Sequence, residues 1–136
     1  MSTKKVFCLG VWDLFHMGHL NLLLSAWKGA DEGHLIVGVV SDEAVRAQKG
    51  NDRPIIPFDE RSTIVGVLGF VRETVKLDGF YFPQEIIDSC DLIVIGEDQS
   101  HIKNVHQVPE AKRLNLPRYA GTSTSEIIRK IKNEPS

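Results

Sequence analysis

The sequence predicts an α/β fold in which helices cover both faces of a parallel β-sheet. Short, almost wholly apolar runs occur at residues 6–9, 34–40 and 92–95, and such runs are typical of parallel strands buried on both faces. Helix signals separate these runs, which is the alternation that builds a doubly covered sheet. A glycine-containing turn at residues 10–19 joins the first run to a helix, and such turns bind ligands at the carboxyl edge of the sheet.

Each element is predicted from a local signal. The first strand and its turn lead into a helix over residues 20–27, and the strand over 34–40 leads into a helix that Ser41 caps and that runs to about residue 47. The remaining elements are expected as a helix over 58–69, a strand over 73–77, a helix over 83–88, a strand over 92–95 and a final helix that begins near residue 123.

Length, charge and cysteine content limit the class of protein. A chain of 136 residues favours one domain, residues 1–136, with a genuine core. The net charge of −2 argues against a general nucleic-acid-binding protein. Cys8 and Cys90 adjoin apolar runs, which favours buried free thiols and a cytoplasmic location. No apolar run approaches ~18 residues, so no membrane span is expected, and the stretch before the first strand is too short for a signal peptide.

Two histidines, His16 and His19, flank Gly18 in the turn after the first strand. Gly18 has no side chain, so backbone and ligand can approach closely between the two rings. Imidazole supplies N–H donors for phosphate oxygens, and its charge can change near neutral pH. A lone histidine here would more simply cap the helix or pack in the core, but a pair around a glycine at a helix N-terminus favours a phosphate site.

Residues 10–19 resemble the signature Gly-x-Phe-Asp-x-x-His-x-Gly-His of the small nucleotidyltransferases, and most of all that of the cytidylyltransferases. The turn carries Gly10, Trp12, Asp13 and the histidine pair at the matching positions. Trp12 replaces the usual Phe, and Val11 stands where the glycerol-3-phosphate enzymes tend to carry Thr. The resemblance implies that these residues bind the nucleotide, with Asp13 orienting the turn rather than reacting.

The irregular segment 48–57 contains two cations, Lys49 and Arg53. Its prolines, glycine and Asn-Asp pair forbid a regular element, so it is either a solvated loop or a mobile flap over phosphates. Lys49 matches a family lysine that contacts the triphosphate and the acceptor phosphate. Where the glycerol-3-phosphate enzymes have a further lysine this chain has Asn51, so Arg53 becomes the next candidate for acceptor binding.

Three further segments are weaker candidates. The pair Glu60-Arg61 resembles one in the family whose arginine faces the acceptor pocket, although an exposed helix ion pair would look the same. Gly96 and Asp98 follow the strand 92–95, at the edge where ligands bind. Residues 101–113 show no clear periodicity, so a solvated segment is expected, with His101 and His106 as minor candidates for reaching an acceptor.

A second motif lies near the end of the chain. Ser123-Thr124-Ser125-Glu126 has the pattern of a capping box, which places hydroxyls and free N–H groups at a helix N-terminus. The segment also resembles the second family signature, Arg-x-x-Gly-x-Ser-Thr-[Thr/Ser]-x-Ile. The matching or adjoining positions implied in nucleotide binding are Arg118, Gly121, Thr122, Ser123 and Thr124.

Together the two signatures cover essentially the whole chain and imply a Rossmann-like (HUP-type) three-layer sandwich with a five-stranded parallel sheet. They imply transfer of CMP from CTP to a phosphorylated alcohol, with glycerol 3-phosphate as the first expectation. The catalytic residues would be His16, His19, Lys49 and Arg118. The alternatives are an adenylyltransferase that uses ATP on a sugar phosphate or flavin mononucleotide, and a nucleotide-binding module without turnover. Magnesium is expected with the triphosphate rather than in a protein-built metal site, and the family resemblance implies a homodimer.

Overall fold

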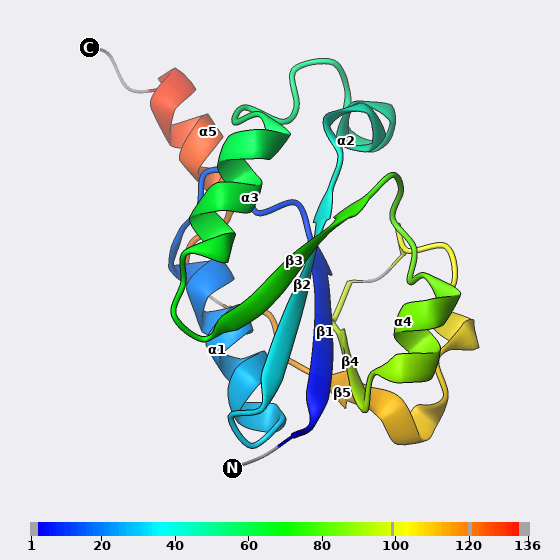
Figure 1. The fold of residues 1–136 in the computed structure, drawn as a ribbon. Helices are drawn as coiled ribbons and strands as arrows, with labels where there is room; N and C mark the ends of the chain where they lie inside the picture. The colour runs from blue at the N-terminus through cyan, green and yellow to red at the C-terminus, as the bar shows by residue number, and fades with distance from the viewer. Residues whose placement is uncertain (1–2, 99, 120, 134–136) are drawn as a thin grey trace.

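A computed structural model describes residues 3–98, 100–119 and 121–133, and within them five strands form one parallel sheet. The strands are β1 (Lys5–Gly10), β2 (His34–Val40), β3 (Val71–Leu77), β4 (Leu92–Ile95) and β5 (Arg113–Asn115). Their spatial order is β3-β2-β1-β4-β5 (Figure 1). The expected α/β fold with a five-stranded parallel sheet is confirmed.

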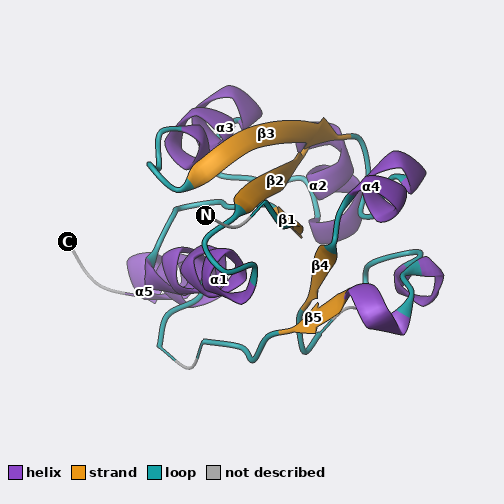
Figure 2. Ribbon diagram, turned by 60° about the horizontal axis from the view of Figure 1, so that its bottom comes forward, coloured by secondary structure: helices purple, strands orange, loops and turns teal. Residues whose placement is uncertain are grey.

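Helices cover both faces of this sheet (Figure 2). On one side lie α1 (Met17–Gly29), α3 (Phe58–Gly66) and α5 (Thr124–Asn133). On the other side lie α2 (Asp42–Lys49), α4 (Gln84–Ser89) and two short 3-10 helices, η1 (Val105–Gln107) and η2 (Glu110–Lys112). This arrangement is the predicted three-layer sandwich.

Alternating side chains of the central strands fill two separate cores. Phe7 of β1 packs toward the α2 and α4 side, where the core includes Phe82 and Ile93. Its neighbours Val6 and Cys8 belong instead to the core beneath α1 and α3. The near-continuous apolar character of β1 and β2 follows from this double burial.

The strand order creates a crevice above β1. One edge of β1 pairs with β2 and the other pairs with β4, all in parallel. The chain therefore passes from β1 outward to β2 and β3 and then returns to the opposite side of β1. Such a switch point leaves a crevice at the carboxyl ends of the strands, where α/β proteins bind ligands.

The largest departure from the sequence prediction concerns residues 101–113, which were expected to be solvated. Ile102 and Val108 are buried in the core next to α4, and Arg113 begins the fifth strand. The guanidinium of Arg113 donates to the carbonyl oxygen of Val108 at 2.9 Å and to that of Val105 at 3.3 Å. The polar composition of the segment thus conceals a folded connection, in which Arg113 bonds to the backbone of the segment and Lys112 bonds to carbonyl oxygens of α4.

The remaining comparisons with the sequence concern the ends of two helices, the cysteines and membrane-spanning segments. Helix α1 begins three residues earlier than expected, and α3 ends at Gly66 rather than residue 69. Cys8 and Cys90 are buried free thiols, as predicted. Among the described residues, none of the helices has the length and apolar character needed to cross a membrane.

Candidate active site

A cavity of about 520 Å³ opens at the carboxyl edge of the sheet, above β1 and β4. Most of the residues predicted from the two signatures and the loop line it, namely Gly10, Val11, Trp12, Asp13, His16, Gly18, His19, Lys49, Arg53, Gly96, Asp98, Arg118, Thr122, Ser123 and Thr124. Gly121 lines a smaller cavity that shares Arg118, Thr122 and Ser123 with the first. The structure therefore brings the two signatures to one place.

His16 and His19 are oriented by the first turn of α1. Nδ1 of His16 accepts a hydrogen bond from the backbone N–H of Gly18 at 3.0 Å. Nδ1 of His19 accepts one from the backbone N–H of His16 at 3.2 Å. Because each Nδ1 acts as an acceptor, each neutral ring carries its proton on Nε2. The two rings stack with their centroids 3.9 Å apart, so both Nε2–H groups belong to one compact donor pair.

Burial keeps this pair uncharged. Desolvation lowers the pKa of His16. The pKa of His19 falls to about 3, first through burial and then through electrostatic interaction with His16 and Lys49, which disfavours a second positive charge at this place. The sequence indicated only that the charge of these imidazoles can change near neutral pH, and the structure favours the neutral form with Nε2–H donors. Neutral imidazoles still donate to phosphate oxygens, and their protonation then depends on the charge that a ligand brings.

Trp12 fixes the other side of His19. Its side chain is 3% exposed, and its indole N–H donates to the carbonyl oxygen of Gly38 at 2.9 Å. The edge of the indole contacts His19, with ring centroids 5.5 Å apart. Gly10 makes room for this larger ring, since a Cβ there would lie 2.6 Å from the indole. The substitution of Trp for the usual Phe therefore links the histidine turn to β2.

The turn after β1 contacts the start of α5. The hydroxyl of Thr124 donates to the carbonyl oxygen of Asp13 at 2.8 Å and lies 3.3 Å from Nε2 of His16. A Cβ on Gly18 would come within 2.8 Å of the carbonyl oxygen of Thr122. Gly18 is thus required for close approach of two backbone segments, and Thr124 joins the two signatures rather than leaving its hydroxyl hydrogen to a ligand.

The N-terminus of α5 also provides a phosphate-binding geometry. Oγ of Ser123 accepts from the backbone N–H of Glu126 at 3.1 Å, which is the serine half of the predicted capping box. The carboxylate of Glu126 pairs with Arg129. Because Ser123 acts as an acceptor in the cap, its hydroxyl hydrogen points elsewhere, at a helix end that favours anions.

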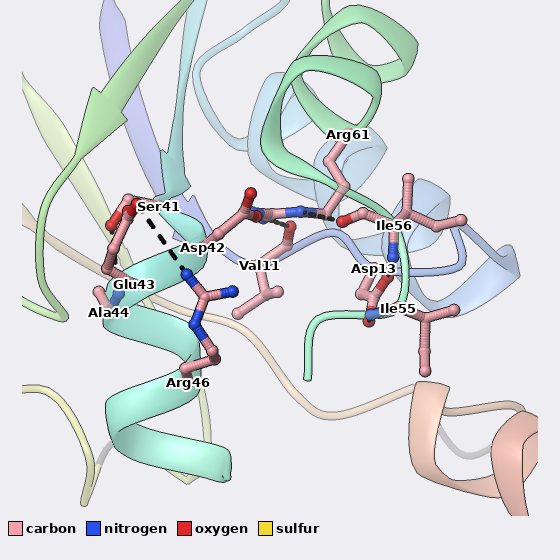
Figure 3. A network of polar contacts seen from close by, with 10 residues as sticks. All are labelled: Val11, Asp13, Ser41, Asp42, Glu43, Ala44, Arg46, Ile55, Ile56 and Arg61. Atoms are coloured by element: carbon pink, nitrogen blue, oxygen red, sulfur yellow. Dashed lines mark hydrogen bonds and ion pairs between the residues drawn. The ribbon is translucent and has the colours of Figure 1, made fainter. Parts of the chain in front are cut away.

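Asp13 holds the loop that follows α2. Its carboxylate accepts from the backbone N–H groups of Ile55 at 2.8 Å and Ile56 at 2.9 Å (Figure 3). The same loop reaches α5 through Arg53, which donates to Oγ of Ser125 at 3.3 Å. Lys49 lines the cavity, and its pKa is lowered by burial and by the charge of Arg53, against the opposing effect of Asp13.

Arg61 is not brought to the cavity. Its side chain is fully buried, and its guanidinium donates to the carbonyl oxygens of Ile56 at 2.8 Å and Val11 at 2.7 Å (Figure 3). The third contact is an ion pair with Asp42 at 2.7 Å. Burial alone would raise the pKa of Asp42, but the hydrogen bond and charge of Arg61 outweigh it and lower the pKa. The expectation that Arg61 faces an acceptor is therefore wrong in this structure, because every arm of its guanidinium is used inside the protein.

The two weaker histidine candidates separate clearly. His101 lines the cavity and contacts the ring of Phe80, with centroids 5.1 Å apart, whereas His106 is exposed on η1, away from the cavity lining. Val45, Phe80 and Ile102 also line the cavity, and no motif marks them. Their positions could have marked two of them as site candidates, since Phe80 and Ile102 lie in the connections that follow the carboxyl ends of β3 and β4.

Residues 7–130 match the family model described as cytidylyltransferase-like. The chain belongs to this cytidylyltransferase-like family. Among curated relatives, it is 37% identical over 141 residues to the bifunctional protein HldE of Proteus mirabilis (strain HI4320). This match covers 98% of this chain and 29% of that protein. The HldE of Yersinia enterocolitica is 36% identical over 140 residues, with 97% and 28% covered. The chain thus spans about three tenths of the length of these relatives.

Solved structures show the same cytidylyltransferase-like fold. A lipopolysaccharide core biosynthesis protein from Thermoplasma volcanium GSS1 matches with a TM-score of 0.66 at 23% identity, over 85% of this chain and 98% of that one. A bifunctional NMN adenylyltransferase/ADP ribose pyrophosphatase from Francisella tularensis, complexed with AMP and a Mn ion, matches with a TM-score of 0.65 at 19% identity. That match covers 99% of this chain and 43% of the other.

The cytidylyltransferase-like site contains few groups that could hold a metal by themselves. Among residues 3–98, 100–119 and 121–133, no three His, Cys, Asp or Glu side chains are grouped as metal ligands. Magnesium, however, is usually held by substrate phosphates, water and one or two carboxylates. The site fits a magnesium ion that arrives with a triphosphate and is held mainly by its phosphates and water.

Proposed function

We propose that this chain transfers a nucleotidyl group from a nucleoside triphosphate to the phosphate of a small acceptor, with release of pyrophosphate. The observation that supports this most strongly is the composition of one cavity. Two imidazoles with Nε2–H donors, Lys49, Arg118 and the N-termini of α1 and α5 all border it. A site that collects so many donors for phosphate oxygens, from both signatures and the loop after α2, suits a ligand with several phosphates.

The proposed reaction is an in-line displacement. An oxygen of the acceptor phosphate forms a bond to the α-phosphorus, the bond from that phosphorus to the bridging oxygen breaks, and pyrophosphate leaves with the electron pair. His16 and His19 donate to oxygens of the reacting phosphate, and Lys49 bridges nucleotide and acceptor phosphates. Arg118, Ser123 and the α5 N-terminus hold the leaving phosphates. Magnesium would add positive charge on the triphosphate, and positioning supplies the remaining rate enhancement.

ATP and a sugar phosphate are the substrates we favour. The chain resembles HldE proteins over nearly its whole length. It also departs from the glycerol-3-phosphate pattern at Val11 and Asn51, where a hydroxyl and a cation for that acceptor would be expected. CTP with glycerol 3-phosphate, the first expectation from the sequence, stays a prediction and forms the comparison arm of the test.

The test measures pyrophosphate release in the presence of magnesium. ATP, CTP, GTP and UTP are each offered with a panel of hexose and pentose phosphates and with glycerol 3-phosphate. We expect release with ATP and a sugar phosphate, and a loss of about 100-fold or more in kcat for His16→Ala, with His106→Ala as the matched control. Release only with CTP and glycerol 3-phosphate would overturn the substrate choice. No release with any pair, together with calorimetric binding of ATP, would instead support a binding module.

A further inference from the structure

The cavity extends beyond the phosphate-binding groups toward the other face of the sheet. We define the His101 pocket as Val45, Lys49, Phe80, Asp98, His101 and Ile102, all of which line the cavity. Val45, Phe80 and Ile102 belong to the core on the α2 and α4 side. Trp12, next to the histidine pair, belongs to the core on the opposite side. The cavity therefore has two chemically different ends, one at the histidine pair and one at the His101 pocket. The phosphate donors described above account for a ligand at the first end only.

The wall that carries His101 is held firmly by backbone contacts. The N–H of Lys103 donates to the carbonyl oxygen of Phe80 at 3.0 Å. The side-chain amide of Asn104 accepts from the N–H of Phe82 and donates to its carbonyl oxygen, both at 2.8 Å. Ile102, which directly precedes Lys103, is 7% exposed. The segment after β4 is thus fastened to the connection after β3, so the position of His101 is set before any ligand binds.

His101 itself has the chemistry to recognise a hydroxyl group. Burial, followed by the charge of Lys49, lowers its pKa, with Asp98 opposing, so the ring is neutral near pH 7. A neutral imidazole offers one N–H donor and one acceptor nitrogen. A sugar hydroxyl likewise donates one hydrogen bond and accepts others, whereas a phosphate group is best met by cations such as Lys49.

The remaining members of the pocket match the body of a sugar. Phe80 presents an aromatic ring that meets His101 edge to face, at an interplanar angle of 77°. Val45 and Ile102 extend this apolar wall at the base of the pocket, where they and Phe80 are 1%, 7% and 4% exposed. The part of the wall that reaches the cavity can contact the C–H face of a sugar ring. The carboxylate of Asp98 adds an acceptor for hydroxyl hydrogens. A three-carbon acceptor has no ring face to lie against this wall.

We propose that His101 determines acceptor specificity by hydrogen-bonding a hydroxyl group of a sugar phosphate whose ring lies against Phe80. Lys49 binds the phosphate of the same molecule and directs it toward the histidine pair. This assignment rests on the proposed function, because that function places the acceptor phosphate at Lys49. It adds a recognition role for a residue that lies outside both signatures.

Two variants separate hydrogen bonding from packing. His101→Phe keeps an aromatic ring against Phe80 but removes both polar atoms, whereas His101→Gln keeps a donor and an acceptor without the ring. The experiment measures calorimetric binding of hexose and pentose phosphates, of glycerol 3-phosphate and of ATP, together with KM and kcat for pyrophosphate release. His106→Phe, on the exposed face of the same segment, is the control.

We expect His101→Phe to weaken binding of the best sugar phosphate by about tenfold, the size of one or two lost hydrogen bonds. Its affinities for ATP and glycerol 3-phosphate should stay within about twofold of the wild type, and KM should change far more than kcat. His101→Gln should recover most of the lost affinity. A packing role would give the reverse order, with Phe harmless and Gln damaging.

Three results would overturn the proposal. The first is equal affinity of the wild type and His101→Phe for the best sugar phosphate. The second is an equal loss of affinity for glycerol 3-phosphate and for sugar phosphates in His101→Phe. The third is that the wild type binds no sugar phosphate more tightly than glycerol 3-phosphate. Failure of the proposed function looks different. In that case the wild type binds a sugar phosphate but releases no pyrophosphate with any nucleotide, and the comparison of variants by binding still decides the role of His101.

Discussion

His19 shows how burial can decide the protonation of a catalytic candidate. Its pKa is about 3 in the folded protein, through burial and then electrostatic interaction with His16 and Lys49, against about 6.5 in an unfolded chain. Between these values the unfolded chain binds more protons, so stability falls as the pH falls below about 6.5. We expect a loss on the order of 2 kcal/mol at pH 5 from this residue, measured as the urea midpoint at pH 7.5 and pH 5.

The matched variants are His19→Asn and His106→Asn. Asn at position 19 keeps an oxygen that can accept from the N–H of His16, but it does not titrate. Stability of His19→Asn should therefore depend less on pH than that of the wild type, while His106→Asn should follow the wild type. If both variants lost the same share of the pH dependence, His19 would not be its source.

At single positions, the sequence predicted which residues belong to the site better than it predicted their burial and contacts. The histidine pair, Lys49 and Arg118 do line one cavity, because their motifs are local and lie at the ends of strands or helices. Arg61 and His101 were placed less well. A buried arginine bonded to carbonyl oxygens and an exposed one have the same local pattern, and only the contacts of distant segments distinguish them. The neutral state of the histidines likewise depends on burial that no short motif records.

At the scale of elements, Arg61 on α3 joins three other parts of the fold. It bonds to the end of β1 through Val11, to the loop through Ile56 and to the start of α2 through Asp42. Arg61→Met would leave Asp42 and two carbonyl oxygens without these partners. We expect a loss of about 3 kcal/mol or more in the free energy of unfolding. Arg61→Lys should rescue little, because a single ammonium group cannot span the three acceptors. Urea unfolding of both variants measures these effects.

Arg129→Met is the control for Arg61. Arg129 pairs with Glu126 on α5, but both side chains are more than half exposed, so its loss should cost less than about 1 kcal/mol. Comparable losses for the two arginines would show that the buried network contributes little. A wild-type-like Arg61→Lys would show that charge alone, rather than the forked geometry, holds the three elements together.

The strands illustrate which elements a sequence can predict. The expected strands at 34–40 and 92–95 agree with β2 and β4, because both lie inside the sheet and are almost wholly apolar. β5 has only three residues, Arg113–Asn115, and pairs with β4 at the edge of the sheet. Its two polar residues and short length leave no periodicity to detect, so its existence depends on register with β4 rather than on local preference.

At the scale of the whole molecule, the site depends on contact between distant parts of the chain. The first signature follows β1, the second opens α5, and they meet through the hydroxyl of Thr124 and the carbonyl of Asp13. The loop after α2 joins both, through the carboxylate of Asp13 and the contact of Arg53 with Ser125. A triphosphate bound among these segments would therefore fasten three otherwise separate connections.

α5 should respond most strongly to such a ligand. None of its residues is buried, so its amides should exchange readily in the free protein. We expect magnesium and ATP to slow hydrogen exchange at the start of α5, at residues 12–19 and at residues 50–56, while β3 and α4 change little. The site groups in all three segments would contact the ligand or each other, so binding stabilises them as one unit.

The measurement is amide exchange by mass spectrometry with and without ATP. It is repeated on Thr124→Val, which removes the hydroxyl that joins the two signatures. Protection should then spread less from residues 12–19 to α5. Protection confined to one signature in the wild type would contradict a shared triphosphate site, because a ligand held by only one signature leaves the other free to open.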